Sequence, residues 1–164
     1  MKQYKKGFTL IELLVVIAII GILSTLAVVS LGNARTRARD SKRVADIRNT
    51  QTALEIYYTD RTAYPTTTAI NGTTCTPATT LEGCCLDNLS TGAGWGATCA
   101  TATRLVTVPN DPRNQTGTTD NYLYSQSGSS YSISFNLESG AGDLAAGAAC
   151  ARPSVITNTG TCTP

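Results

Sequence analysis

The chain contains no histidine, and this absence narrows the chemistry that is open to it. It also has little charge, because only 15% of its 164 residues are Asp, Glu, Lys or Arg. We find no nucleophile–base pair, no paired carboxylates with a signature spacing and no phosphate-binding loop. The sequence therefore does not indicate an enzyme, although a membrane-tethered enzyme is one alternative class. The net charge of +2 gives no indication of a nucleic-acid partner.

Aromatic residues are scarce as well, with one Trp and two Phe. Any globular core is therefore small, and small cores usually need covalent support. The chain has an even number of cysteines, and all of them lie beyond the N-terminal apolar segment: Cys75, Cys84, Cys85, Cys99, Cys150 and Cys162. In an exported protein this pattern predicts three disulfides. The alternative is a metal site, but without histidine and without a C-x-x-C pair we predict none.

A nearly uninterrupted apolar run occupies residues 8–31, which is long enough for one membrane-spanning helix at ~1.5 Å per residue. A short basic leader ending in Gly7 precedes it, and its one acidic residue is Glu12. A carboxylate in such a segment is costly unless it has a partner, so Glu12 is a candidate functional residue. A secretory signal is disfavoured because no small-x-small cleavage site follows. An ordinary membrane anchor explains neither Gly7 nor Glu12.

The charges on the two sides of the apolar run conflict with the cysteines. Basic residues are more numerous within residues 35–48 than in the leader, which would place the C-terminal side in the cytoplasm. Disulfides do not persist in a reducing cytosol, so we follow the cysteines and expect a cytoplasmic N-terminus. The basic stretch 35–48 is interpreted as a solvated face, with lipid headgroups or other subunits as alternative partners.

No proline occurs before Pro65, so the helix is free to continue beyond the membrane. Beyond the apolar run, five residues recur at helical spacing and would form one face of an amphipathic helix. They are Val44, Ile47, Gln51, Leu54 and Tyr58. We expect one helix from Phe8 to about Asp60, ended by the turn residues before Pro65.

Residues 63–164 are expected to form a small head that consists mainly of β-strands and loops. Residues 66–103 are rich in Thr, Gly and Ala and are interpreted as irregular loops held by disulfides. A short β run is expected at 104–108, and a hairpin at 121–126 and 130–137. Apolar residues alternate with polar ones in its second strand: Tyr131, Ile133, Phe135 and Leu137. The predicted fold class is α+β, with the long helix packed against an antiparallel sheet.

The sequence Gly7-Phe8-Thr9-Leu10-Ile11-Glu12 resembles the recognition site of prepilin peptidase in type IV pilins and pseudopilins. The resemblance continues to Pro65. This longer stretch is similar to the major pseudopilins of type II secretion in particular. It implies cleavage between Gly7 and Phe8 and N-methylation of Phe8. It also implies that in the filament Glu12 faces the N-terminal amine of Phe8 in a neighbouring subunit. In a departure, many members carry a proline where this chain has Val29 or Ser30, which puts a kink there in doubt.

The resemblance divides the chain into a leader (1–7), a membrane and filament-core helix (8–31), an amphipathic continuation (32–62) and a head (63–164). It implies a structural subunit that polymerises with copies of itself into a type IV pilus. The alternatives are a major pseudopilin of a secretion or DNA-uptake system, and a minor pilin that acts as an adhesin or a DNA-binding tip. The implied partners are prepilin peptidase and an assembly platform in the inner membrane. The filament would be extracellular or periplasmic.

Two details of the head follow from the resemblance, and a third from the residues. The resemblance implies a Cys150–Cys162 disulfide that closes a C-terminal loop. It also implies calcium near the C-terminus, where residues 138–143 hold two acids. Their spacing matches no calcium loop, so a surface turn and no cofactor are favoured. Because Cys84 and Cys85 are adjacent, each is expected to pair with Cys75 or Cys99 instead.

Overall fold

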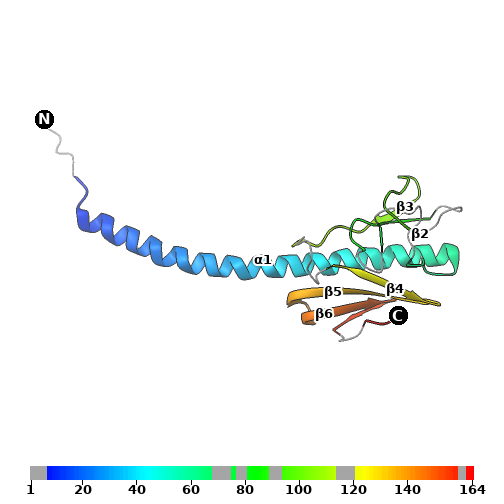
Figure 1. The fold of residues 1–164 in the computed structure, drawn as a ribbon. Helices are drawn as coiled ribbons and strands as arrows, with labels where there is room; N and C mark the ends of the chain where they lie inside the picture. Colours follow the sequence, from blue (N-terminus) through cyan, green and yellow to red (C-terminus); the bar gives the residue numbers. More distant parts are fainter. Residues whose placement is uncertain (1–6, 68–74, 77–80, 89–93, 114–120, 159–161) are drawn as a thin grey trace. The chain divides into compact units, whose positions relative to one another are not determined.

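A computed structural model describes residues 7–67, 75–76, 81–88, 94–113, 121–158 and 162–164. The chain divides into two compact units, which we describe separately: the N-terminal unit of residues 1–36 and the head unit of residues 37–164. One helix, α1 (Leu10–Arg61), contributes residues to both units (Figure 1).

The helix ends one residue after the position that the sequence predicts. Thr62 adopts a left-handed conformation with φ of 57°, and its N–H donates to the carbonyl of Tyr58 at 2.7 Å. This is a common way to close the last turn of a helix. Pro65 follows shortly afterwards and cannot continue a helix.

The head unit contains two antiparallel sheets. The four-stranded sheet has the order β4-β5-β6-β7, and its strands are β4 (Leu123–Ser127), β5 (Ser130–Ala141), β6 (Leu144–Arg152) and β7 (Val155–Thr157). The three-stranded sheet has the order β2-β1-β3, and its strands are β1 (Cys85–Asp87), β2 (Gly94–Gly96) and β3 (Arg104–Thr107). The predicted α+β fold is thereby confirmed.

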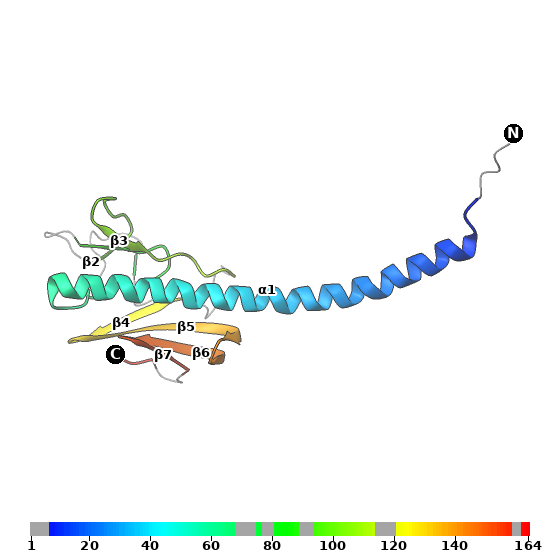
Figure 2. The same cartoon turned by 180° about the vertical axis from the view of Figure 1, so that it is seen from behind.

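Within the head unit, α1 passes between the two sheets, which lie on opposite sides of the helix in both views (Figure 1 and Figure 2). The helix contributes Ile47 and Leu54, both fully buried, to one shared core. Each sheet adds aromatic side chains, and the rings of Trp95 and Tyr124 lie 5.3 Å apart across the sheets. The small core predicted from the composition thus includes α1, with one sheet on each side of the helix.

The predicted helix face and the predicted hairpin are both confirmed. Val44, Ile47 and Leu54 are buried, while Gln51 is half-buried and donates through its side-chain amide to the carbonyl of Arg152 at 2.7 Å. The four apolar residues of the second hairpin strand are also buried, and they are Tyr131, Ile133, Phe135 and Leu137.

Four strands were missed by the sequence analysis. β1 and β2 lie in the region that was interpreted as irregular, and each is only three residues long. β6 was missed because it is built mainly from Ala and Gly, which have little intrinsic preference for strands. Its pairing with β5, from Ile133 opposite Ala151 to Leu137 opposite Gly147, decides its conformation instead.

The six cysteines form three disulfides, Cys75–Cys84, Cys85–Cys99 and Cys150–Cys162. The last pair is the one that the resemblance implied. The adjacent residues Cys84 and Cys85 do not pair with each other. Cys84 pairs with Cys75 and Cys85 pairs with Cys99, as predicted. All three bonds link residues of the head that are close in sequence, with separations of 9, 14 and 12 residues.

Candidate assembly site and charge network

The first turn of α1 is closed by a reciprocal pair of side chains, Thr9 and Glu12. The backbone N–H of Thr9 donates to Glu12 Oε2 at 2.8 Å, and the Thr9 hydroxyl donates to the same oxygen at 2.5 Å. In return, the backbone N–H of Glu12 donates to Thr9 Oγ1 at 3.3 Å. This is a capping box, which satisfies N–H groups that have no partner within a helix.

Glu12 therefore has partners within its own chain, which the sequence analysis did not foresee. The signal was present, because Thr9-Leu10-Ile11-Glu12 has the T-x-x-E spacing of a capping box before an apolar run. Both bonds from Thr9 end on Oε2, so Oε1 accepts no hydrogen bond within the described part of the chain. One oxygen of Glu12 is thus left for a partner outside the subunit.

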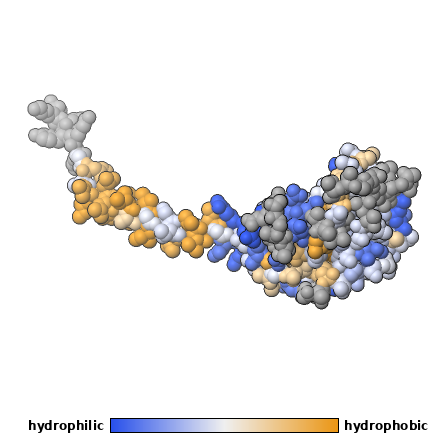
Figure 3. Space-filling model, viewed as in Figure 1, coloured by the Kyte–Doolittle hydropathy of each residue, from blue (hydrophilic) through white to orange (hydrophobic). Residues whose placement is uncertain are grey.

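The segment of residues 8–31 exposes its large apolar side chains along its whole length. Phe8 is 82% exposed and Val29 is 69% exposed, and the large apolar residues between them are exposed as well. In Figure 3 apolar side chains cover most of the visible face of the N-terminal unit. Among the described helices α1 is long and apolar enough to cross a membrane. Such a surface requires lipid or other proteins around it.

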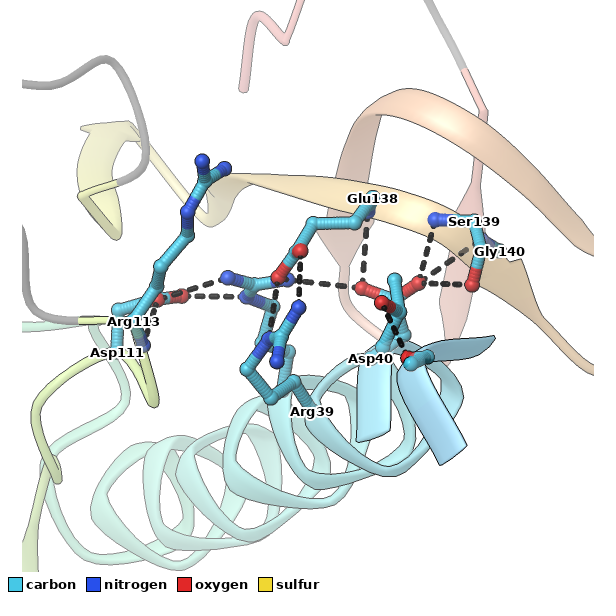
Figure 4. A network of polar contacts seen from close by, with 10 residues as sticks. Arg39, Asp40, Asp111, Arg113, Glu138, Ser139 and Gly140 are labelled. Carbon is cyan, nitrogen blue, oxygen red and sulfur yellow. Dashed lines mark hydrogen bonds and ion pairs between the residues drawn. The ribbon is translucent and has the colours of Figure 1, made fainter. Parts of the chain in front are cut away.

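A second group of charges lies in the head unit around Arg43, whose side chain is only 1% exposed. Figure 4 labels its other members, Arg39, Asp40, Asp111 and Glu138. Its Nε and Nη2 donate to the two oxygens of Asp111 at 2.5 and 2.8 Å. Its Nη1 donates to Asp40 Oδ1 and to Glu138 Oε1, both at 2.8 Å. Arg39 donates to both oxygens of Glu138, at 2.8 and 2.5 Å. We call these five residues the charge network.

Asp40 is the deepest acid of the charge network and is fully buried. Its oxygens accept the backbone N–H groups of Glu138, Ser139 and Gly140 at 2.9, 2.7 and 3.0 Å, and the hydroxyl of Ser139 at 2.9 Å. Burial by itself raises the pKa of Asp40, but these donors together with Arg43 outweigh it and lower the pKa. Asp40 therefore carries its charge in the folded head.

Glu138 is also held in its charged form. Hydrogen bonds from Arg39, assisted by Arg43, lower the pKa of Glu138 to about 2 against the opposing effect of partial burial. Hydrogen bonding to Asp111 correspondingly raises the pKa of Arg43. Asp40 and Glu138 are therefore ionised near neutral pH beside the charged Arg39 and Arg43.

These contacts correct the interpretation of the basic stretch 35–48 as a solvated face. Arg39 and Arg43 turn into the head and pair with acids there, and Arg43 is almost fully buried. Arg37 and Arg48 are exposed, as the sequence analysis expected. Sequence alone could not separate these arginines, because their acidic partners Asp111 and Glu138 lie far away in the chain.

Comparisons with known proteins match the N-terminal part of the chain. A family model described as the prokaryotic N-terminal methylation motif matches residues 2–28. Type II secretion system core protein G of Klebsiella michiganensis is 44% identical over 66 residues, which cover 40% of this chain and 46% of the relative. The protein of the same name from Vibrio cholerae is 42% identical over 69 residues, covering 41% and 47%. The N-terminal part of this chain is thus similar to major pseudopilins and carries the N-terminal methylation motif.

A further relative is the fimbrial protein EcpC of Eikenella corrodens. It is 38% identical over 76 residues, which cover 46% of this chain and 50% of the relative. The pilin-like chain spans about half the length of the curated relatives that it matches. No solved structure shows a significant match to it. The similarity to these relatives thus covers less than half of this chain.

The residues near the C-terminus do not fit the calcium that the family resemblance implied. Both oxygens of Glu138 accept hydrogen bonds from arginines, and the N–H groups of Ser139 and Gly140 donate to Asp40. Asp143 is exposed in the turn between β5 and β6. Within the described residues no group of three His, Cys, Asp or Glu residues is placed to hold a metal. The expected surface turn is also shorter than predicted, since Glu138–Ala141 belong to β5.

Proposed function

We propose that this chain is a structural subunit that polymerises through its N-terminal helix into a type IV pilus filament. The observation that carries the proposal is the contrast in burial between the two units. The head unit closes its own core, whereas none of the residues that the structure describes covers the apolar side chains of residues 8–31. Lipid would cover this surface before assembly, and the helices of neighbouring subunits would cover it afterwards.

Processing by prepilin peptidase is supported by the local structure at Gly7 and Phe8. Gly7 is exposed and precedes α1, and a Cβ added to Gly7 would meet no atom within 4 Å. The fold therefore does not require glycine at this position, whereas an accessible backbone suits a peptidase. Cleavage after Gly7 would leave Phe8 as the new N-terminus, which the same enzyme would methylate. The matching N-terminal methylation motif supports this step.

The free oxygen of Glu12 supports its proposed role in assembly. Thr9 holds the carboxylate through Oε2, and Oε1 stays available for the amine of Phe8 in a neighbouring subunit. In an apolar filament core each charge would offset the desolvation cost of the other. The capping box would then hold the carboxylate of Glu12 in position to accept from this amine.

The proposed location and partners follow from the same features. The precursor would lie in the inner membrane with its N-terminus in the cytoplasm, where prepilin peptidase acts. An inner-membrane assembly platform would pass it into a periplasmic or extracellular filament, in which it contacts copies of itself. The three disulfides of the head support export to an oxidising compartment. We propose no catalytic activity, no cofactor and no nucleic-acid partner.

The second candidate is a major pseudopilin of a type II secretion or DNA-uptake system. It is favoured by the relatives named type II secretion system core protein G. These matches cover 66 to 69 residues, and the fimbrial relative matches a similar length. The matched part therefore does not separate a pilus from a pseudopilus. A minor pilin at the tip is a weaker candidate, because Glu12 favours a bulk subunit.

The test is to shear the surface of the source cells and to analyse the released fraction by electron microscopy and mass spectrometry. Filaments composed of this chain, starting at methylated Phe8, would establish a pilus subunit. A processed chain found only in the membrane fraction would instead establish the pseudopilin alternative. A chain that retains residues 1–7 would contradict both candidates.

A further inference from the structure

We propose that the guanidinium of Arg43 is the internal cation that fastens the β5–β6 hairpin to α1, so that this head folds and stays folded without calcium. This role of Arg43 lies within the head unit and is the same whichever filament the subunit forms. Near residues 138–143, where calcium was implied, arginine side chains and backbone N–H groups already bond the acids.

The first step is that Arg43 connects three separate parts of the head. Asp40 lies on α1, Asp111 lies in the segment after β3, and Glu138 lies on β5. The guanidinium reaches all three carboxylates within 2.8 Å, and it does so while almost fully buried. A planar fork of donors suits this task, because it can bind one carboxylate through two parallel bonds and still reach others.

The second step is that the acids have no free oxygen for a metal. Both oxygens of Asp40 accept hydrogen bonds, Oδ1 from Arg43 and Oδ2 from Ser139 and Gly140. Both oxygens of Asp111 accept from Arg43, and both oxygens of Glu138 accept from arginines. Calcium requires six to eight oxygen ligands, so it would have to displace bonds that are already made.

The third step is that the backbone of β5 is shaped to hold an anion. The register of β5 and β6 shifts between Leu137 and Gly140, and Gly140 has a φ of +95°. A Cβ at Gly140 would clash with the carbonyl oxygen of Leu144. This bulge turns successive N–H groups toward Asp40 (Figure 4). Donors that point inward bind a carboxylate and would repel a metal ion.

The deciding experiment uses the full mature chain in detergent micelles, with thermal unfolding followed by the fluorescence of the buried Trp95. The wild-type protein is heated with millimolar calcium chloride and with excess EGTA. Because a cation that does not bind the folded state cannot stabilise it, the two melting temperatures should agree within about 1 °C. A rise of several degrees with calcium would overturn the proposal.

Calorimetry adds a direct measurement of binding on the same sample. Titration of calcium into the chain should show no saturable heat. A saturable calcium signal that the Asp143→Asn variant loses would also overturn the proposal.

The variant Arg43→Gln removes the internal cation and leaves three acids close together. Its melting temperature should fall by roughly 10 °C. The matched control is Arg48→Gln, which removes an exposed charge from the same helix and should leave the melting temperature unchanged. If Arg43→Gln yields no folded protein, Arg39→Gln is used, with a smaller fall expected. A melting temperature that falls no further in these variants than in Arg48→Gln would contradict the proposal.

Discussion

The two halves of α1 each carry a carboxylate that accepts backbone N–H groups, and they use it in different ways. In the N-terminal unit Glu12 accepts from Thr9 of its own chain segment and remains exposed. In the head unit Asp40 accepts from three residues of β5 and is fully buried. The first carboxylate has capacity left for another subunit, whereas the bonding of the second is complete within the subunit.

The comparison shows that hydropathy along a helix does not reveal which charges matter. Glu12 stood out because apolar residues surround it, yet its nearest partners are local. Asp40 and Arg43 lie in a polar stretch that resembles an ordinary solvated face, yet they lie at the centre of the head. Partners far away in the sequence, Asp111 and Glu138, decide the role of Arg43.

The largest expected effect is on assembly and comes from Glu12→Ala. Filaments should be lost, because the amine of Phe8 would enter the apolar core without a counter-charge. Cleavage after Gly7 should continue, because the peptidase site is unchanged. The measurement is filament yield in sheared fractions, with the processed chain quantified in membranes.

Glu12→Asp serves as the control that keeps the charge but shortens the side chain. The melting temperature of the head should stay the same in both variants, since Glu12 lies outside the head unit. Normal filaments from Glu12→Ala would refute the proposed pairing.

The next largest effect is on the stability of the head and comes from Asp40→Ala. This change leaves Arg43 with one partner fewer and three N–H groups of β5 without an acceptor. We expect a loss of about 3–5 kcal/mol in the free energy of unfolding, measured by urea denaturation. Asp143→Ala, at an exposed turn, should change it by less than about 0.5 kcal/mol. Equal effects of the two variants would contradict the charge network.

A smaller effect appears in the pH dependence of stability. The pKa of Glu138 is lowered from 4.5 to about 2 in the folded head, so the unfolded chain binds more protons between these values. The stabilisation from its charge should therefore be complete above about pH 4.5 and vanish as the pH falls toward 2. It is measured as the difference in unfolding free energy between the wild type and Glu138→Gln.

The difference between two variants is needed because other acids act in the opposite sense. Burial raises the pKa of Asp46 and of Glu82, so their contribution favours the folded state at low pH. Both groups are present in the wild type and in Glu138→Gln, and their contribution cancels. A difference that stays constant from neutral pH to pH 2 would be inconsistent with a charged Glu138.

The smallest effect concerns the capping box. Thr9→Ala removes the hydroxyl that binds Glu12 and should weaken the first turn of α1 by about 1 kcal/mol. Amide hydrogen exchange of Leu13, whose N–H donates to the carbonyl of Thr9, should then become roughly fivefold faster in micelles. Thr9→Ser keeps the hydroxyl and should exchange like the wild type. Unchanged exchange in Thr9→Ala would show that the cap does not hold this turn.

The sequence was sufficient to predict the helix, its buried face and the β4–β5 hairpin, because each has a local periodic pattern. It was not sufficient for β6, whose Ala and Gly residues become a strand only through pairing with β5. The partners of Arg43 also escaped prediction, since Asp111 is 68 residues away and Glu138 is 95 residues away. In the candidate site, Thr9 was the residue that sequence reasoning overlooked.

The positions of the disulfides have a mechanical consequence. No cysteine lies between Leu10 and Arg61, so no crosslink joins α1 to either sheet. Arg39 and Asp40 instead bond α1 to β5 without a covalent link. Because non-covalent bonds break under a smaller force than disulfides and can form again, we expect tension on α1 to loosen the helix from β5 while the disulfides keep the loops of the head closed.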